Sequence, residues 1–261
     1  MKVVFPARSR PTLTLLLWLC LLWAMPALAG AASPEIQVWP DVVEIGAFFN
    51  GHGVTVIGQV PPGAQAVIEI TGQTADEPLM RKGRRGGLWM NVGEVVVQGA
   101  PSLYLAASSS PPLLKAPAEN AAWGYPALKK QISFAGQMGQ AERNLFLDQF
   151  FQLKESEGVY AIFPGDLKVS GASGDAQKVT GTFPLPTTVK PGAYRVCLTA
   201  VQDGQVIAKN CGDLKVVMVG FPAMLASLAY EHGATYGILA VVIAIVTGFA
   251  IGYLFKGGGG H

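Results

Sequence analysis

Hydrophobic residues follow two kinds of pattern along this chain. One apolar run extends from Leu13 to Trp23, and a second run without any charged residue extends from Tyr236 to Phe255. Between them, apolar and polar residues alternate in short segments separated by glycine and proline, which is typical of β-strands. The pattern predicts two terminal membrane-directed segments and a β-rich middle.

The strand-like runs fall into two regions, Ile36 to Ser109 and Lys178 to Val219. In the second region the pair Asp203-Gly204 predicts a hairpin turn, in which Gln202 lies opposite Gln205. Runs at this spacing favour antiparallel Ig-like β-sandwich regions. The predicted strands cover 54–57, 66–72, 94–97, 102–106, 179–183, 193–202, 205–209 and 214–219.

A helical pattern interrupts the β regions. Phe146, Phe150 and Leu153 recur at helical spacing, joined by Leu147 and Phe151. Gly158 supplies a stop, so we expect a helix from Ala141 to Ser156. This aromatic stripe packs against the sheets in one interpretation and binds a partner in the other. The segment from Pro111-Pro112 through Pro126 is expected to be a loop.

The first apolar run belongs to an export signal. Basic residues precede it, and Pro26-Ala27-Leu28-Ala29 has the small residues of a cleavage site, which predicts cutting after Ala29 and loss of Cys20. An uncleaved anchor helix is the alternative. No small residue precedes Cys20, so no lipid anchor is predicted.

The second run, Tyr236 to Phe255, is long enough to cross the hydrocarbon core of a membrane. Lys256 follows it, and the positive-inside tendency agrees with the export signal in placing the C-terminus in the cytoplasm. We therefore expect a single-pass protein of the inner (cytoplasmic) membrane with its N-terminal domain in the periplasm.

These patterns predict a mainly β protein with an inserted α-helix and one C-terminal transmembrane helix. The expected divisions are a signal peptide (1–29), a first β-sandwich region (30–110), a linker and helix (111–158), a second β region (159–220), a juxtamembrane segment and transmembrane helix (221–255) and a cytoplasmic tail (256–261).

Composition and charge argue against two classes of protein, disordered proteins and nucleic-acid-binding proteins. Half of the chain is hydrophobic and 14% is charged, which excludes an intrinsically disordered protein. The net charge of +2 comes from the signal peptide, because the rest of the chain has 16 basic and 17 acidic residues. A nearly neutral exported domain is not expected to bind nucleic acid.

Four basic residues crowd around Gly83, next to Gly86-Gly87, and predict a basic turn. They are Arg81, Lys82, Arg84 and Arg85. Guanidinium groups offer paired donors to carboxylate, sulfate or phosphate, so one hypothesis is a site for an oxyanion or lipid headgroup. The alternative is a solvated tip partly neutralised by Asp76, Glu77 or Glu94.

Cys197 and Cys211 are the only cysteines left after signal cleavage, and they flank the predicted Asp203-Gly204 turn in an oxidising compartment. A two-residue turn places Cys197 opposite Asn210, one residue out of register. A disulfide therefore predicts a β-bulge between the turn and the cysteines, for which Lys209-Asn210 is a plausible place. Two buried reduced thiols are the alternative.

The apolar C-terminal run has small residues at four-residue steps, on one face of a helix. They are Ala240, Ala244, Gly248 and Gly252. Such a face permits close helix packing, although small residues are also common in membrane spans.

No nucleophile elbow, phosphate loop or metal-ligand spacing is found, and His52 lies in a glycine-rich turn sequence. We therefore expect no metal and no cofactor, and an enzyme is the least favoured class.

Several segments together resemble the Alph_Pro_TM family of transmembrane proteins, described mainly from alphaproteobacteria. They are Phe48-Phe49-Asn50-Gly51 with Val54 to Gly58, Arg81-Lys82 with Gly87 to Asn91, Pro101 to Ser109, and Leu185-Pro186 with Pro191 to Tyr194. The resemblance implies an exported domain with one C-terminal span and supplies no catalytic residues. Family members are often encoded beside sulfite-exporter-type permeases, which implies an integral membrane partner.

Two functions follow as hypotheses. The first is a non-enzymatic accessory or interaction protein whose span docks on an integral membrane protein. The second is an oxyanion-binding module centred on Arg81 to Arg85.

Overall fold

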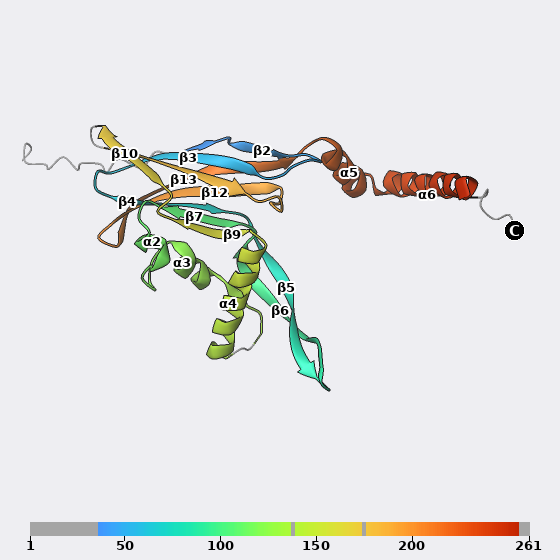
Figure 1. Ribbon diagram of the computed structural model, residues 1–261, viewed down its shortest axis with the longest axis horizontal. Helices are drawn as coiled ribbons and strands as arrows, with labels where there is room; N and C mark the ends of the chain where they lie inside the picture. The colour runs from blue at the N-terminus through green and yellow to red at the C-terminus, as the bar shows by residue number, and fades with distance from the viewer. Residues whose placement is uncertain (1–35, 137–138, 174–175, 256–261) are drawn as a thin grey trace, which may run out of the picture. The chain divides into compact units, whose positions relative to one another are not determined.

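The computed structural model describes residues 36–136, 139–173 and 176–255 (Figure 1). The predicted signal peptide, with Cys20, and the predicted tail at 256–261 lie outside the described residues.

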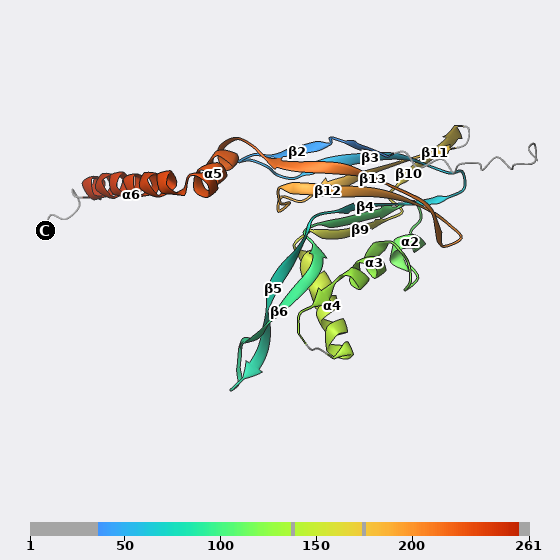
Figure 2. The same cartoon turned by 180° about the vertical axis from the view of Figure 1, so that it is seen from behind.

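Two β-sheets form the body of the protein (Figures 1 and 2). The first is antiparallel, in the order β1 (Ile36–Trp39), β3 (His52–Val60), β11 (Ala176–Leu185) and β10 (Lys168–Ser173). The second has the order β2 (Val42–Ile45), β13 (Gln205–Met218), β12 (Gly192–Gln202), β4 (Gln65–Thr71), β7 (Tyr104–Ser108) and β9 (Tyr160–Pro164). Its outer pairs, β2 with β13 and β7 with β9, are parallel.

One hydrophobic cluster joins the two sheets. Val54, Val56 and Phe183 from the first sheet belong to it together with Ile68 and Leu198 from the second. β3 buries alternate residues, as a strand with one face on the core does. β4 from Ala66 to Ile70 and β7 along its whole length are buried on both faces, because helices cover the side away from the first sheet (Figure 1).

Strands from both predicted β regions share these sheets. β3 pairs with β11 and β4 pairs with β12, although more than a hundred residues separate the partners. The prediction of a mainly β, sandwich-like fold is confirmed, and the two regions complete one another's sheets.

A third sheet consists of the long hairpin β5 (Thr74–Arg85) and β6 (Leu88–Pro101) with the short β8 (Ser133–Phe134). Gly86 and Gly87 form the turn with positive φ angles of 58° and 85°. The predicted basic turn is therefore corrected: Arg81 to Arg85 lie in β5, because the two glycines that follow supply the conformation that the turn needs.

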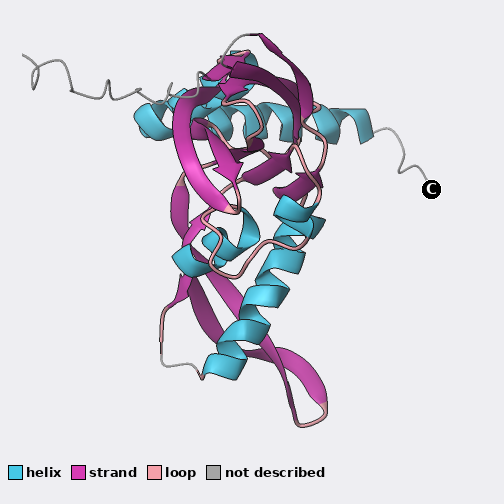
Figure 3. Ribbon diagram, turned by 90° about the vertical axis from the view of Figure 1, so that its left-hand side faces the viewer, coloured by secondary structure: helices cyan, strands magenta, loops and turns pink. Residues whose placement is uncertain are grey.

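Helix α4 (Gln140–Ser156) confirms the predicted helix, and it runs obliquely to the hairpin (Figure 3). Its residues Leu147, Phe150 and Phe151 are buried in the core, so this part of the stripe packs against the sheets. The segment predicted as a loop contains α2 (Pro112–Lys115) and the start of α3 (Gly124–Gln131). That prediction was wrong because buried Leu113, Leu114 and Leu128 anchor these short helices to the core.

β13 is one strand of 14 residues, where the sequence indicated two, because Asn210 to Asp213 remain paired with β12. It leads into α5 (Gly220–Glu231) and α6 (Gly233–Phe255). α6 has 23 residues, a mean hydropathy of 2.6 and no buried residue, and it is long and apolar enough to cross a membrane. The predicted C-terminal apolar helix is confirmed.

Candidate functional site

A groove of about 560 Å³ lies between the β5–β6 hairpin and α4. Four large apolar side chains line it while remaining exposed to solvent: Met80 is 59% exposed, Trp89 74%, Leu145 57% and Leu153 39%. A single exposed apolar residue needs no explanation, but a cluster in a concave surface is typical of an interaction site.

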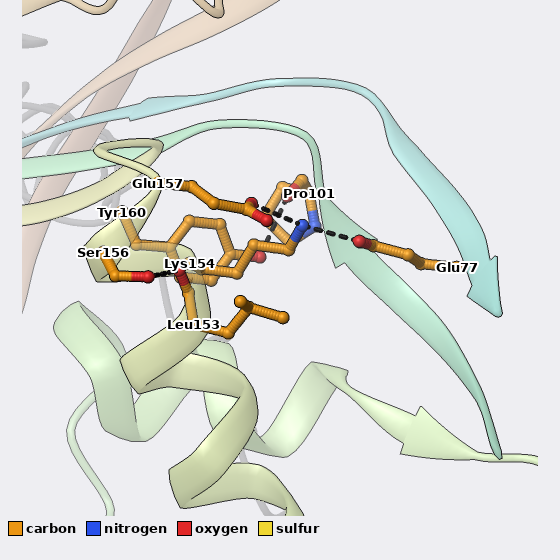
Figure 4. A network of polar contacts seen from close by, with 7 residues as sticks. All are labelled: Glu77, Pro101, Leu153, Lys154, Ser156, Glu157 and Tyr160. Atoms are coloured by element: carbon orange, nitrogen blue, oxygen red, sulfur yellow. Dashed lines mark hydrogen bonds and ion pairs between the residues drawn. The ribbon is translucent and has the colours of Figure 1, made fainter. Parts of the chain in front are cut away.

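Two ion pairs hold the hairpin against the helix. Towards the hairpin tip, Arg81 Nη1 lies 2.7 Å from Glu142 Oε1. At the other end, Lys154 Nζ lies 2.7 Å from Glu77 Oε1 and 3.1 Å from Glu157 Oε2 (Figure 4). The groove is therefore braced at both ends by contacts between β5 and α4.

Lys154 is 8% exposed, which is rare for a lysine, and its environment explains the burial. Its stem lies in the core, its ammonium lies 5.5 Å from the centre of the Phe150 ring, and both nearby carboxylates are partly solvated. Beside it, the Tyr160 hydroxyl donates a hydrogen bond of 2.9 Å to the Pro101 carbonyl (Figure 4). Burial raises the pKa of Tyr160, with a smaller contribution from the charge of Glu77.

The four basic residues of the hairpin point in different directions. Arg84 lies opposite Trp89 and Lys82 opposite Asn91, whereas Arg85 lies opposite Leu88. Since side chains alternate between the faces of a strand, Arg84 and Arg85 lie on opposite faces. Arg81 pairs with Glu142, and Arg84 Nε donates to the Gly87 carbonyl at 3.4 Å. The cations therefore line a hairpin and do not converge on one point.

Cys197 and Cys211 lie directly opposite one another on β12 and β13, and their sulfur atoms are bonded. Gln202 lies opposite Gln205, as the Asp203-Gly204 turn predicts. The register then shifts between Val201 and Ala200, so a bulge lies between the turn and the cysteines. Its position at Ile207 corrects the expected place: Lys209 and Asn210 are regularly paired, because the shift has already occurred nearer the turn.

A buried polar network was missed by sequence reasoning. Glu69, in the middle of the apolar strand β4, is 8% exposed. It accepts a hydrogen bond from the Tyr104 hydroxyl and another, of 3.0 Å, from the Gly124 amide at the start of α3. Burial, and then the charge of Glu69, raise the pKa of Tyr104. A glutamate inside an apolar run is the one signal that could have indicated it.

The predicted helix-packing residues, Ala240, Ala244, Gly248 and Gly252, all lie on α6, whose side chains are exposed along its length. Within the described part of the chain, no group of three or more His, Cys, Asp or Glu residues could hold a metal ion.

The sandwich and the exposed apolar helix define a β-rich protein with one candidate membrane span. Residues 35–257 match the family model described as "Putative transmembrane protein (Alph_Pro_TM)". The chain belongs to this family, and the resemblance seen in the sequence is confirmed.

No curated protein sequence matches the chain. Among solved structures, "Structure or murine CRIg" matches with 10% sequence identity and a TM-score of 0.24, over 72% of this chain and 98% of that chain. A similarity at this level supports no conclusion about the fold or the function.

Proposed function

We propose that this transmembrane protein is a non-enzymatic accessory protein, whose groove between the hairpin and α4 binds a segment of an integral membrane partner. The observation that supports this most is the cluster of Met80, Trp89, Leu145 and Leu153, which is exposed on a braced surface. Such a surface can bind without large rearrangement, which lowers the entropic cost of association.

Exposed side chains continue the surface to the hairpin tip. Arg84 is exposed and lies opposite Trp89, on the face of the hairpin that lines the groove, whereas Leu88 and Arg85 lie on the other face. An apolar centre with cations at its edge suits a partner segment that combines apolar and acidic residues. The basic residues would then help to bind the partner segment and would not form a dedicated oxyanion site. That alternative stays testable by calorimetry with sulfite, sulfate and phosphate.

The proposed location is the inner (cytoplasmic) membrane, with the β domain in the periplasm and the C-terminus in the cytoplasm. The export signal at 1–29 and Lys256 after the span support this topology. The family resemblance favours a sulfite-exporter-type permease as partner. The small-residue face of α6 would pack on the partner within the bilayer.

Co-purification of the full chain with its membrane partner tests the proposal. We expect Trp89→Ala combined with Leu145→Ala to reduce recovery of the partner at least about tenfold, because truncating central apolar contacts costs more than about 1 kcal/mol each. Trp39→Ala is the matched control, because Trp39 on β1 is 73% exposed but lies outside the groove.

A second arm tests the span. Gly252→Leu keeps the helix apolar and should permit insertion while weakening co-purification. Recovery unchanged in the groove double variant would contradict the role of the groove, whatever the result for Gly252→Leu.

A further inference from the structure

A second cleft, of about 800 Å³, is lined by residues of α2, α3 and the N-terminal half of α4. The half-buried Tyr125 and Ile162 provide its apolar surface, above the buried Leu114 and Leu147. The volume falls within the range of about 300–1,000 Å³ that is typical of ligand sites. This cleft uses residues of α4 other than those that line the groove.

Positive charge dominates its rim. Lys115 lies in the last turn of α2, Lys129 and Lys130 lie in the last turn of α3, and Arg143 lies near the start of α4. Glu119 is the one carboxylate among the described residues that line the cleft. The rim therefore has an excess of positive charge in a chain that is nearly neutral after loss of its signal.

Two of these cationic side chains, those of Lys129 and Arg143, already interact with other groups of the protein. Lys129 Nζ lies 2.8 Å from Asp148 Oδ1 and 5.3 Å from the centre of the Phe151 ring. Arg143 Nη2 donates a hydrogen bond of 3.1 Å to the Ile132 carbonyl. Glu155 nearby accepts a hydrogen bond from the Tyr125 hydroxyl, at 2.7 Å. These contacts shape the cleft and leave its other cations without a carboxylate.

Lys115 and Lys130 have no ion pair or hydrogen bond from their side chains within the described part of the chain. Two exposed ammonium groups therefore border an apolar surface with no internal partner. Such groups attract anions, and the attraction is screened by salt.

The arrangement does not suit a small oxyanion. A compact anion needs donors that converge on one point, whereas these cations come from three separate helices around an open cleft. Lys115 and Lys130 also lie at helix C-termini, where the backbone carbonyls repel an anion bound close to them. Separate charges beside apolar surface match a chain in which carboxylates and apolar side chains alternate.

We propose that this cleft binds an acidic peptide segment, whose carboxylates pair with Lys115 and Lys130 while its apolar side chains cover the half-buried Tyr125 and Ile162. The site is independent of the groove and does not depend on the proposed function.

The test uses the full chain in detergent and a fluorescein-labelled library of nonapeptides with alternating acidic and apolar positions. A second library has glutamine and asparagine at the acidic positions. Fluorescence anisotropy should show binding of the acidic library, weaker at 0.5 M than at 0.05 M salt. Lys115→Gln combined with Lys130→Gln should weaken binding about fivefold or more, from the loss of two charge pairs.

Lys168→Gln combined with Lys190→Gln removes the same charge elsewhere and should leave binding within about twofold. Equal thermal unfolding of the two double variants would show that both are folded. Equal binding of the two libraries, no binding of the acidic library, or an unaffected cleft variant would overturn the proposal. Displacement by inorganic phosphate beyond that by chloride at equal ionic strength would indicate a small-oxyanion site and would also overturn it.

Discussion

At the residue scale, the contact between Tyr104 and Glu69 makes a prediction about pH. The pKa of Tyr104 is raised by burial and by Glu69, so the unfolded chain releases this proton at a lower pH than the folded chain. The stabilisation is therefore complete below about pH 10 and is lost as the pH rises further.

Tyr104→Phe should reduce stability near pH 7 by about 1–2 kcal/mol, because Glu69 loses a buried hydrogen bond. Above pH 10, the decline in stability should be shallower than in the unsubstituted chain by up to about 1.4 kcal/mol per pH unit. Urea unfolding between pH 7 and 11.5 measures both effects. If the free energy of unfolding fell equally with pH in both proteins, the raised pKa of Tyr104 would be contradicted.

The disulfide predicts a second effect at this scale. Cys197 and Cys211 are 14 residues apart, and closing a loop of this size stabilises a fold by about 3 kcal/mol in the chain-entropy model. Cys197→Ser combined with Cys211→Ser should lower the free energy of unfolding by about this amount. Thiol labelling of the denatured and unreduced protein should find no free thiol at Cys197 or Cys211, and two free thiols at these positions would refute the bridge.

These two sites differ in how far the sequence could predict them. The cysteines stand on either side of a recognisable turn, so register arithmetic predicts a bulge even though it does not locate Ile207. Glu69 stands in an apolar run whose partners, Tyr104 and Gly124, are 35 and 55 residues away. No local pattern specifies contacts of that kind.

At the scale of elements, Lys154 connects α4 to the hairpin. Comparing the losses of stability in two variants tests its role. Lys154→Met keeps the packing over Phe150 and leaves partly exposed carboxylates that water can solvate, so we expect a loss of about 1 kcal/mol. Glu77→Gln combined with Glu157→Gln leaves a buried ammonium unpaired and should cost about 3 kcal/mol.

Urea unfolding of the two variants in one buffer shows which of them loses more free energy of unfolding. The reverse order would show that Lys154 contributes through its stem alone. Lys129→Met, which removes the exposed pair with Asp148, is the control and should cost less than about 1 kcal/mol.

Helix α4 and the apolar helix α6 were predictable because each has a long pattern with one period or one composition. α2 and α3 were not, because elements of four and eight residues next to several prolines contain too few turns for a period to show. The basic residues beside Gly83 indicated a turn by composition, but the pairing partners in β6 hold them in a strand.

At the scale of the whole molecule, the sandwich depends on pairings between strands that lie far apart in the sequence. The pairing of β3 with β11 and of β4 with β12 cannot be deduced from alternation, which indicates a strand but not its partner. The groove was unpredictable for the same reason, because Met80, Trp89 and Leu145 come from three elements that only the fold brings together. The span needed no tertiary information and was predicted correctly.

Site-specific photocrosslinking in intact cells is the most direct test of the groove as a binding site for a membrane partner. The photoreactive residue p-benzoylphenylalanine replaces Leu145 in the groove or, as the control, Trp39 outside it. Irradiation should attach an integral membrane protein to the chain from position 145 and not from position 39. No adduct from position 145, or the same adduct from both positions, would contradict the groove as the binding site.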